Sequence, residues 1–108
     1  MLRILGVALA LVVSPPASAQ FFDGNDLHAM CGSDDRAPVI AYSMGALDAA
    51  FMYQKLSGVR DRICMQDGIE ASQVADVVCN YLDDRPGDRH WLGADLVAES
   101  AAAAWPCE

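Results

Sequence analysis

Apolar residues recur with a helical period between residues 70 and 85. Their i, i+3, i+4, i+7, i+8 spacing places one apolar stripe on a helix. The stripe consists of Val74, Val77, Val78, Tyr81 and Leu82. We expect this helix to end within residues 83–87, because Pro86 disfavours helical geometry in the residue before it and Gly87 frees the turn.

A broader apolar pattern over residues 36–57 predicts the longest helix. Pro38 falls in its first turn, where the missing N–H of proline has no cost. Gly45 lies in its interior and lowers helix stability by about 1 kcal/mol relative to alanine. We therefore expect another helix to approach closely at Gly45, and we expect Asp48 to be solvated.

Two further helices flank these central ones. Asp23 or Asn25 can cap a short helix that ends at Cys31. Asp88 can cap a fourth helix over residues 89–104, whose alanine run gives high helix propensity and a smooth surface of small side chains. No segment of five or more residues alternates with period two without a better helical match, so we predict an all-α bundle of about four helices.

The first nineteen residues have the features of a secretory signal peptide. A short basic start is followed by an apolar run over residues 4–13 and by the small residues Ala17, Ser18 and Ala19. We predict cleavage after Ala19, a single domain over residues 20–108 and a periplasmic location. A membrane anchor is disfavoured because the apolar run is half the roughly 20 residues needed to span a bilayer.

The mature chain is strongly acidic. Without Arg3 it keeps six basic and 15 acidic side chains, and so a net charge of −9. Such a surface repels phosphate backbones and anionic lipids, which argues against nucleic acid and membrane as partners. It would help to steer a basic protein partner towards the chain.

Four cysteines in a small exported domain predict two disulfides. Three pairings exist. Cys79 lies about 8 residues, roughly 12 Å, beyond the start of its helix, whereas bridged Cα atoms lie within about 7 Å, so a bond to Cys64 is disfavoured. We favour Cys31 with Cys79 and Cys64 with Cys107.

Groups for catalysis or metal binding are sparse. Asp23 with His28 and Asp88 with His90 are the acid and imidazole neighbours, and no nucleophile elbow or phosphate loop accompanies them. The cysteines form no Cys-x2-Cys pair, and neither histidine has a second histidine nearby, which argues against zinc. We therefore predict no enzyme, no metal and no cofactor.

Several short motifs follow one another in a fixed order along the mature chain. They are residues 21–27 (FFDGNDL), Cys31, residues 42–48 (YSMGALD), Ile63-Cys64, Gln73, Val77-Val78, Tyr81-Leu82, Pro86, Arg89-His90 and residues 104–107 (AWPC). In order and spacing the chain resembles the Rap/Tai immunity proteins of bacterial type VI secretion systems. That resemblance implies a small periplasmic helical protein that binds and blocks a cell-wall amidase effector, and by analogy a homodimer.

Two departures from the family pattern stand out. The family has a second cysteine near residues 39–41, where this chain has none, whereas Cys79 is additional. One disulfide is then rewired. Residues 65–67 and Glu70 stand where the family has a proline and a capping threonine, so the local backbone is expected to differ there while the architecture is kept.

The resemblance makes an immunity protein our first hypothesis. We take the connector of residues 83–88 as its contact surface, with Asp83, Asp84, Arg85 and Asp88 as candidate partner-binding residues, and a merely solvated connector as the alternative. A small acid-stress chaperone of the HdeA type is the second hypothesis, because acid would protonate the crowded carboxylates and loosen such a fold. A periplasmic helical domain of another role is the third.

Overall fold

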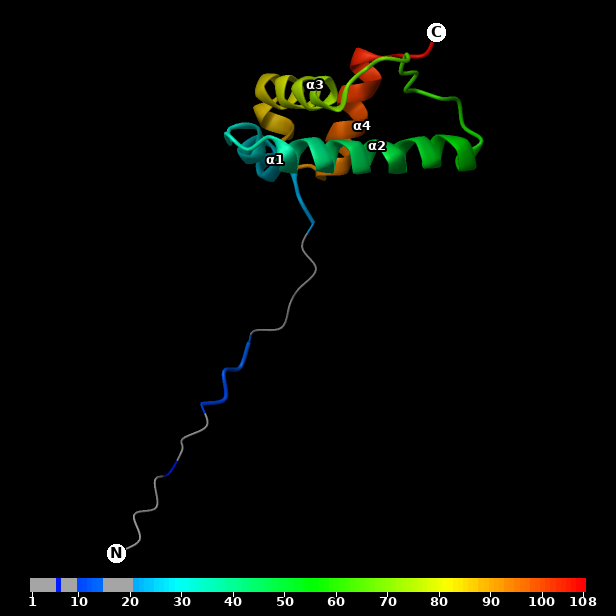
Figure 1. The fold of residues 1–108 in the computed structure, drawn as a ribbon. Helices are drawn as coiled ribbons and strands as arrows, with labels where there is room; N and C mark the ends of the chain where they lie inside the picture. The colour runs from blue at the N-terminus through cyan, green and yellow to red at the C-terminus, as the bar shows by residue number, and fades with distance from the viewer. Residues whose placement is uncertain (1–5, 7–9, 15–20) are drawn as a thin grey trace, which may run out of the picture.

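Four α-helices form the structure, a computed structural model that describes residue 6, residues 10–14 and residues 21–108 (Figure 1). The elements are α1 (Gly24–Cys31), α2 (Ala37–Ser57), α3 (Ala71–Asp84), the short 3-10 helix η1 (Pro86–Asp88) and α4 (Gly93–Ala104). These residues contain no strand, so the all-α prediction is confirmed. The predicted cleavage site after Ala19 lies outside the described residues.

Side chains at the helix starts explain where two of the helices begin. Asp23, one of the two candidate caps, accepts a hydrogen bond from the Asp26 backbone N–H at 2.9 Å, and Asp26 accepts one from the Asp23 N–H at 3.0 Å. Glu70 and Gln73 form the same reciprocal capping box on α3. Each box satisfies amide groups that have no partner inside the helix.

The core lies where α2, α3 and α4 meet, with α1 packed across one end (Figure 1). The predicted stripe of α3 faces it: Val74, Val78 and Leu82 are buried. The other buried members of this cluster are Leu27, Leu47, Ile63, Leu96, Val97 and Ala101. The apolar period of α3 thus identified its buried face.

The prediction for α4 was wrong at its start. The helix begins at Gly93, four residues after Arg89, and Asp88 belongs to η1 and does not cap it. The reason is a set of backbone bonds to α1: Gly24 N–H donates to Trp91 O at 3.0 Å, and Asn25 N–H donates to Arg89 O at 2.9 Å. The first amides of α1 have no partner inside that helix. The Arg89 and Trp91 carbonyls can accept hydrogen bonds from them because residues 89–92 are not helical; in a helix these carbonyls would accept from amides four residues further along.

The prediction for Gly45 was also wrong. Gly45 is exposed, and a Cβ built on it would meet nothing within 4 Å. The close approaches occur instead at Gly24, where a Cβ would lie 2.7 Å from Arg89 O, and at Gly93, where it would lie 2.9 Å from Phe22 O. Asp48 is exposed, as expected.

Two disulfides hold the helices and the chain end, in the pairing favoured from the sequence. Cys31–Cys79 joins α1 to α3 with a Cα–Cα distance of 5.8 Å. Cys64–Cys107 joins the connection between α2 and α3 to the C-terminal residues, with a Cα–Cα distance of 5.0 Å. Beside it, Cys64 N–H donates to Trp105 O at 2.8 Å, so the C-terminal residues are also held by a backbone bond.

Candidate partner-binding surface

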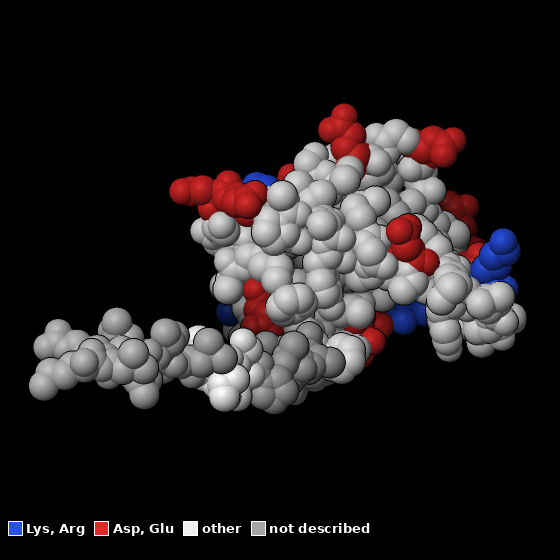
Figure 2. All heavy atoms as spheres, turned by 60° about the horizontal axis from the view of Figure 1, so that its bottom comes forward, with Lys and Arg blue, Asp and Glu red and all other residues white. Residues whose placement is uncertain are grey.

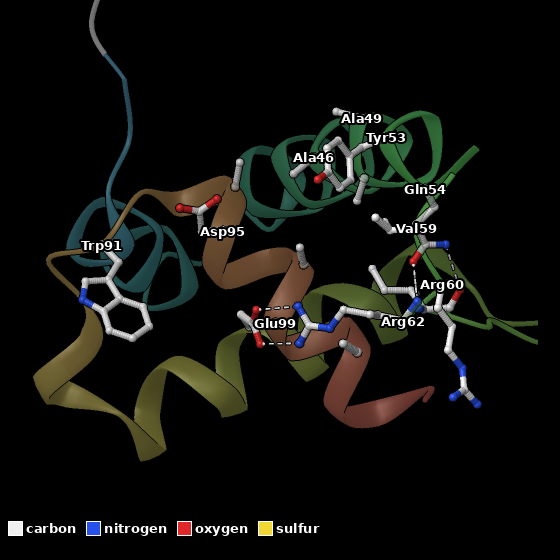
Figure 3. A pocket seen from close by; sticks show the side chains of 15 residues that line it. Ala46, Ala49, Tyr53, Gln54, Val59, Arg60, Arg62, Trp91, Asp95 and Glu99 are labelled. Atoms are coloured by element: carbon white, nitrogen blue, oxygen red, sulfur yellow. Dashed lines mark hydrogen bonds and ion pairs between the residues drawn. The ribbon is translucent and has the colours of Figure 1, made fainter. Parts of the chain in front are cut away.

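A groove of about 550 Å³ runs between α2 and α4 (Figure 3). Alanines from both helices line it, and because their side chains are small the space between the helices stays open. They are Ala46, Ala49, Ala50, Ala94, Ala98 and Ala102. Tyr53 and Trp91 flank the groove with 65% and 46% of their surface exposed. Exposed aromatic side chains beside an apolar floor are typical of surfaces that bind proteins.

The segment after α2 closes one end of this groove. The Gln54 side chain accepts hydrogen bonds from the backbone N–H groups of Arg62 at 3.0 Å and Ile63 at 2.8 Å, and donates one to Ile63 O at 3.2 Å. One amide side chain thereby satisfies three backbone groups and brings Ile63 into the core. These bonds fix Arg62 and Ile63, at the end of the non-helical segment of residues 58–63.

Arg62 spans from that segment to α4. Its Nη1 and Nη2 atoms donate to the two carboxylate oxygens of Glu99 at 2.9 and 3.0 Å (Figure 3). These bonds lower the pKa of Glu99 more than its partial burial raises it, and they raise the pKa of Arg62. Both side chains remain substantially exposed, so the pair forms a charged, planar feature on the surface.

A second groove of about 590 Å³ lies on the other side of α4, against α3. Arg62 and Glu99 line both grooves and so form the ridge between them. In the second groove the Arg85 guanidinium lies 4.5 Å from the centre of the Tyr81 ring, a cation–π contact. We call the two grooves and their shared ridge the α4 surface.

The structure does not bring the four predicted contact residues into one patch. Arg85 lines the second groove, but Asp83 turns towards α1, where its Oδ1 lies 2.8 Å from His28 Nε2. Asp84 is exposed at the end of α3. Asp88 is half-buried, and its N–H donates to Arg85 O at 3.1 Å. The connector is therefore partly structural.

Sequence reasoning missed Tyr53, Trp91 and the Arg62–Glu99 pair. These residues come from α2, from the turn before α4, from the segment after α2 and from α4, so no local pattern groups them. The alanine run of α4 was a partial signal: it predicted a smooth small-residue surface, and one of its residues, Ala102, lines the groove together with Ala94 and Ala98.

Other kinds of site find no support in the residues that the structure describes. Among them no three His, Cys, Asp or Glu side chains converge in a way that would hold a metal ion. None of the described helices combines the length and the apolar character needed to cross a membrane. The α4 surface is thus the best-formed candidate for binding.

Comparison with known proteins identifies a family. The family model of the Rap1a immunity proteins matches residues 23–107. No curated protein and no solved structure is similar enough to count as a match. The matched range begins at the cap of α1 and ends at the last cysteine of the second disulfide, so it contains the whole helical fold. Because the match spans well over half of the chain, this protein belongs to the Rap1a immunity protein family, which implies an immunity protein against a secreted effector.

Proposed function

We propose that the protein is a periplasmic immunity factor that binds and blocks a peptidoglycan amidase delivered by type VI secretion. The observation that carries the proposal is the family match over residues 23–107, which gives an immunity protein against a secreted effector. The motif resemblance supplies the amidase and the secretion system. By the same resemblance we propose a homodimer.

Export is proposed on two grounds. Residues 1–19 have the leader pattern, and the two disulfides are bonds that persist in oxidising compartments. A cell-wall amidase acts in the periplasm, so an immunity factor has to meet it there. The disulfides also suit a binding protein, because they keep the contact surface rigid and reduce the entropy lost on binding.

The protein acts by occupying the effector and needs no chemistry of its own. The α4 surface supplies exposed aromatics, an alanine floor and the Arg62–Glu99 ridge, and Arg85 extends it towards the connector. We propose that Asp83, Asp84 and Asp88 contribute at the rim of this contact. The net charge of −9 predicted for the mature chain speeds the approach of a basic effector.

The test uses the mature chain, residues 20–108, and amidase effectors encoded near it. We expect stoichiometric inhibition of peptidoglycan hydrolysis and binding that calorimetry detects at micromolar concentrations or below. Trp91→Ala and Tyr53→Ala should weaken binding at least tenfold, as truncation of a buried aromatic anchor does. Phe21→Ala removes an aromatic residue that is 81% exposed and does not line either groove, so it serves as the matched control.

Two results would contradict the proposal. The first is no binding to any neighbouring effector at micromolar concentration. The second is protection of an unrelated client from aggregation at acidic pH, which is the property of an acid-stress chaperone. Equal loss of binding in Phe21→Ala and Trp91→Ala would leave the immunity role intact but would place the contact elsewhere.

A further inference from the structure

The side of α2 that faces away from the core is apolar. Val39, Ser43 and Leu47 point into the core and mark its inner side. With 3.6 residues per turn, the opposite side carries a set of residues that are all exposed. These residues, which we call the outer stripe, are Ala41, Gly45, Ala49, Met52 and Leu56, of which Ala49 also lines the edge of the α2–α4 groove.

The outer stripe is unusual for the solvent face of a surface helix, which ordinarily carries charged residues. Over its 21 residues α2 has two charged side chains, Asp48 and Lys55. Met52 is 59% exposed and Leu56 is 74% exposed. Figure 2 views the molecule from the side on which α2 lies in Figure 1, and its uncovered centre shows few charged side chains. Such an apolar area on an acidic protein marks an interaction site.

We propose that the outer stripe is the interface of a homodimer, in which two copies of α2 pack antiparallel about a two-fold axis between Ala49 and Met52. This inference rests on the homodimer of the proposed function but not on the identity of the effector. It adds the surface and the geometry of the contact.

The size of the side chains favours a second copy as the occupant. The small residues Ala41, Gly45 and Ala49 lie in the first part of the stripe, and the large residues Met52 and Leu56 lie in the second part. An antiparallel pair places the large residues of one copy over the small residues of the other, whereas a parallel pair places large against large. One surface is then complementary to itself, as a two-fold interface requires.

The charges agree with the same arrangement. Asp48 and Lys55 are seven residues apart, about two turns, and so lie along one edge of the stripe. In the antiparallel pair, Asp48 of each copy comes within about 3 Å, measured along the helix, of the level of the partner's Lys55. In a parallel pair about a two-fold axis, the two copies of this edge would lie on opposite sides of the contact, so Asp48 could not pair with the partner's Lys55.

Gly45 gains a role from this contact. It lowers the helix propensity of α2, yet nothing in the folded chain lies within 4 Å of the position its Cβ would take. A glycine on the outer stripe lets a second helix come close, because the distance between two helix axes depends on the side chains at the contact. The partner's Leu56 fills this space.

The test is a charge exchange measured by sedimentation on the mature chain. Asp48→Lys alone and Lys55→Asp alone should each weaken dimerisation by about tenfold, since two ion pairs become two repulsions, and the double variant should restore it. Asp67→Lys, an equal change of charge at an exposed site outside α2, should have less effect. Gly45→Ala should raise the unfolding temperature of the monomer and weaken the dimer severalfold.

The outcomes separate the inference from the proposed function. If the unmodified chain stays monomeric up to millimolar concentration, the homodimer and this interface are both wrong, while inhibition of an amidase still stands on its own assay. If the chain is a dimer whose affinity does not respond to the charge exchange, the homodimer stands and the outer stripe is the wrong surface. Restoration by the double variant, without loss from Asp67→Lys, supports the antiparallel pair.

Discussion

The two ends of the molecule differ in how tightly they are packed. At the packed end, α1 lies against α3 and the residues that lead into α4, and neither Gly24 nor Gly93 has room for a methyl group. An ion pair between Arg36 and Asp76 at 2.7 Å lies near the Cys31–Cys79 disulfide there. At the open end are the second half of α2, residues 58–69 and the C-terminal residues.

The open end leaves large apolar side chains in solvent. Met52, Leu56 and Val59 are each more than half exposed, and the segment after α2 is held mainly by Gln54 and by the Arg62–Glu99 pair. The contrast teaches that stability and binding are largely separated in this fold. The packed end supplies the rigid frame and also positions Trp91 at the groove, whereas the open end presents large apolar side chains that have no use within one copy of the chain.

The two disulfides give the largest test of this contrast. They close loops of similar size, with sequence separations of 48 and 43, so the chain-entropy model gives each about 4 kcal/mol. Replacing Cys31 and Cys79 together by alanine should cost about 1 kcal/mol more than replacing Cys64 and Cys107, because Cys79 is 7% exposed and leaves a cavity in a buried cluster. Urea unfolding of the two double variants measures the difference. Equal losses would contradict a tighter packed end.

Glycine replacements test the same contrast without touching a covalent bond. Gly24→Ala should destabilise by about 3 kcal/mol, because the new Cβ would lie 2.7 Å from Arg89 O and 2.8 Å from Arg89 Cα, and backbone atoms cannot move aside cheaply. Gly45→Ala should instead raise the free energy of unfolding by up to about 1 kcal/mol. Urea midpoints at concentrations where the chain is monomeric check both. A stable Gly24→Ala variant would show that the packed end can relax.

The sequence predicted what short-range chemistry determines. The apolar stripe of α3 and a cap at Asp23, one of two candidates, follow from spacing and hydrogen-bonding side chains, and the structure contains both. Helix length argued only against a Cys64–Cys79 bond, and of the two remaining pairings the structure contains the favoured one. The start of α4 could not be predicted in this way. Its residues 89–92 have helical propensity, but α1, more than 60 positions earlier, takes their carbonyls as hydrogen-bond acceptors.

The candidate surface was predictable only in part. The alanine run pointed to a smooth face, but Arg62 and Glu99 are 37 residues apart and meet only because Gln54 fixes the segment that carries Arg62. The prediction of a close approach at Gly45 failed for a related reason. An interior glycine indicates a close approach, but the sequence does not say whether the approaching helix belongs to the same copy of the chain.

Two buried serines differ in whether their hydroxyl groups form hydrogen bonds. Ser43 on α2 is fully buried, and its hydroxyl makes no hydrogen bond with any described residue, whereas the Ser100 hydroxyl donates to Val97 O at 2.8 Å. Ser43→Ala should therefore stabilise the fold by about 1 kcal/mol, because an unpaired buried hydroxyl is costly. Ser100→Ala is the matched control and should lower stability by about 0.5 kcal/mol. Thermal unfolding compares the two, and a loss in Ser43→Ala would mean that its hydroxyl has a partner.

The smallest expected effect concerns the pair that holds the open end. Hydrogen bonds from Arg62 lower the pKa of Glu99. A carboxyl group whose pKa is lowered on folding stabilises the folded state at pH values above its ordinary pKa of about 4.3. This contribution is lost as the pH falls through the lowered pKa. Because the two side chains are 66% and 39% exposed, solvent screens them, and Glu99→Gln should cost only about 0.5 kcal/mol at neutral pH.

The loss in Glu99→Gln should vanish in acid, where the carboxylate is protonated in both states and the bridge is absent from the unmodified chain as well. Urea unfolding of the two proteins across this pH range measures it, with Asp67→Asn as a control at an exposed carboxylate outside the ridge. A loss of several kcal/mol in unfolding free energy, or a loss that persists in acid, would mean that the folded structure depends on the ridge. The open end would then be a structural part of the frame, and its exposed side chains could no longer be assigned to binding on the ground that the fold does not need them.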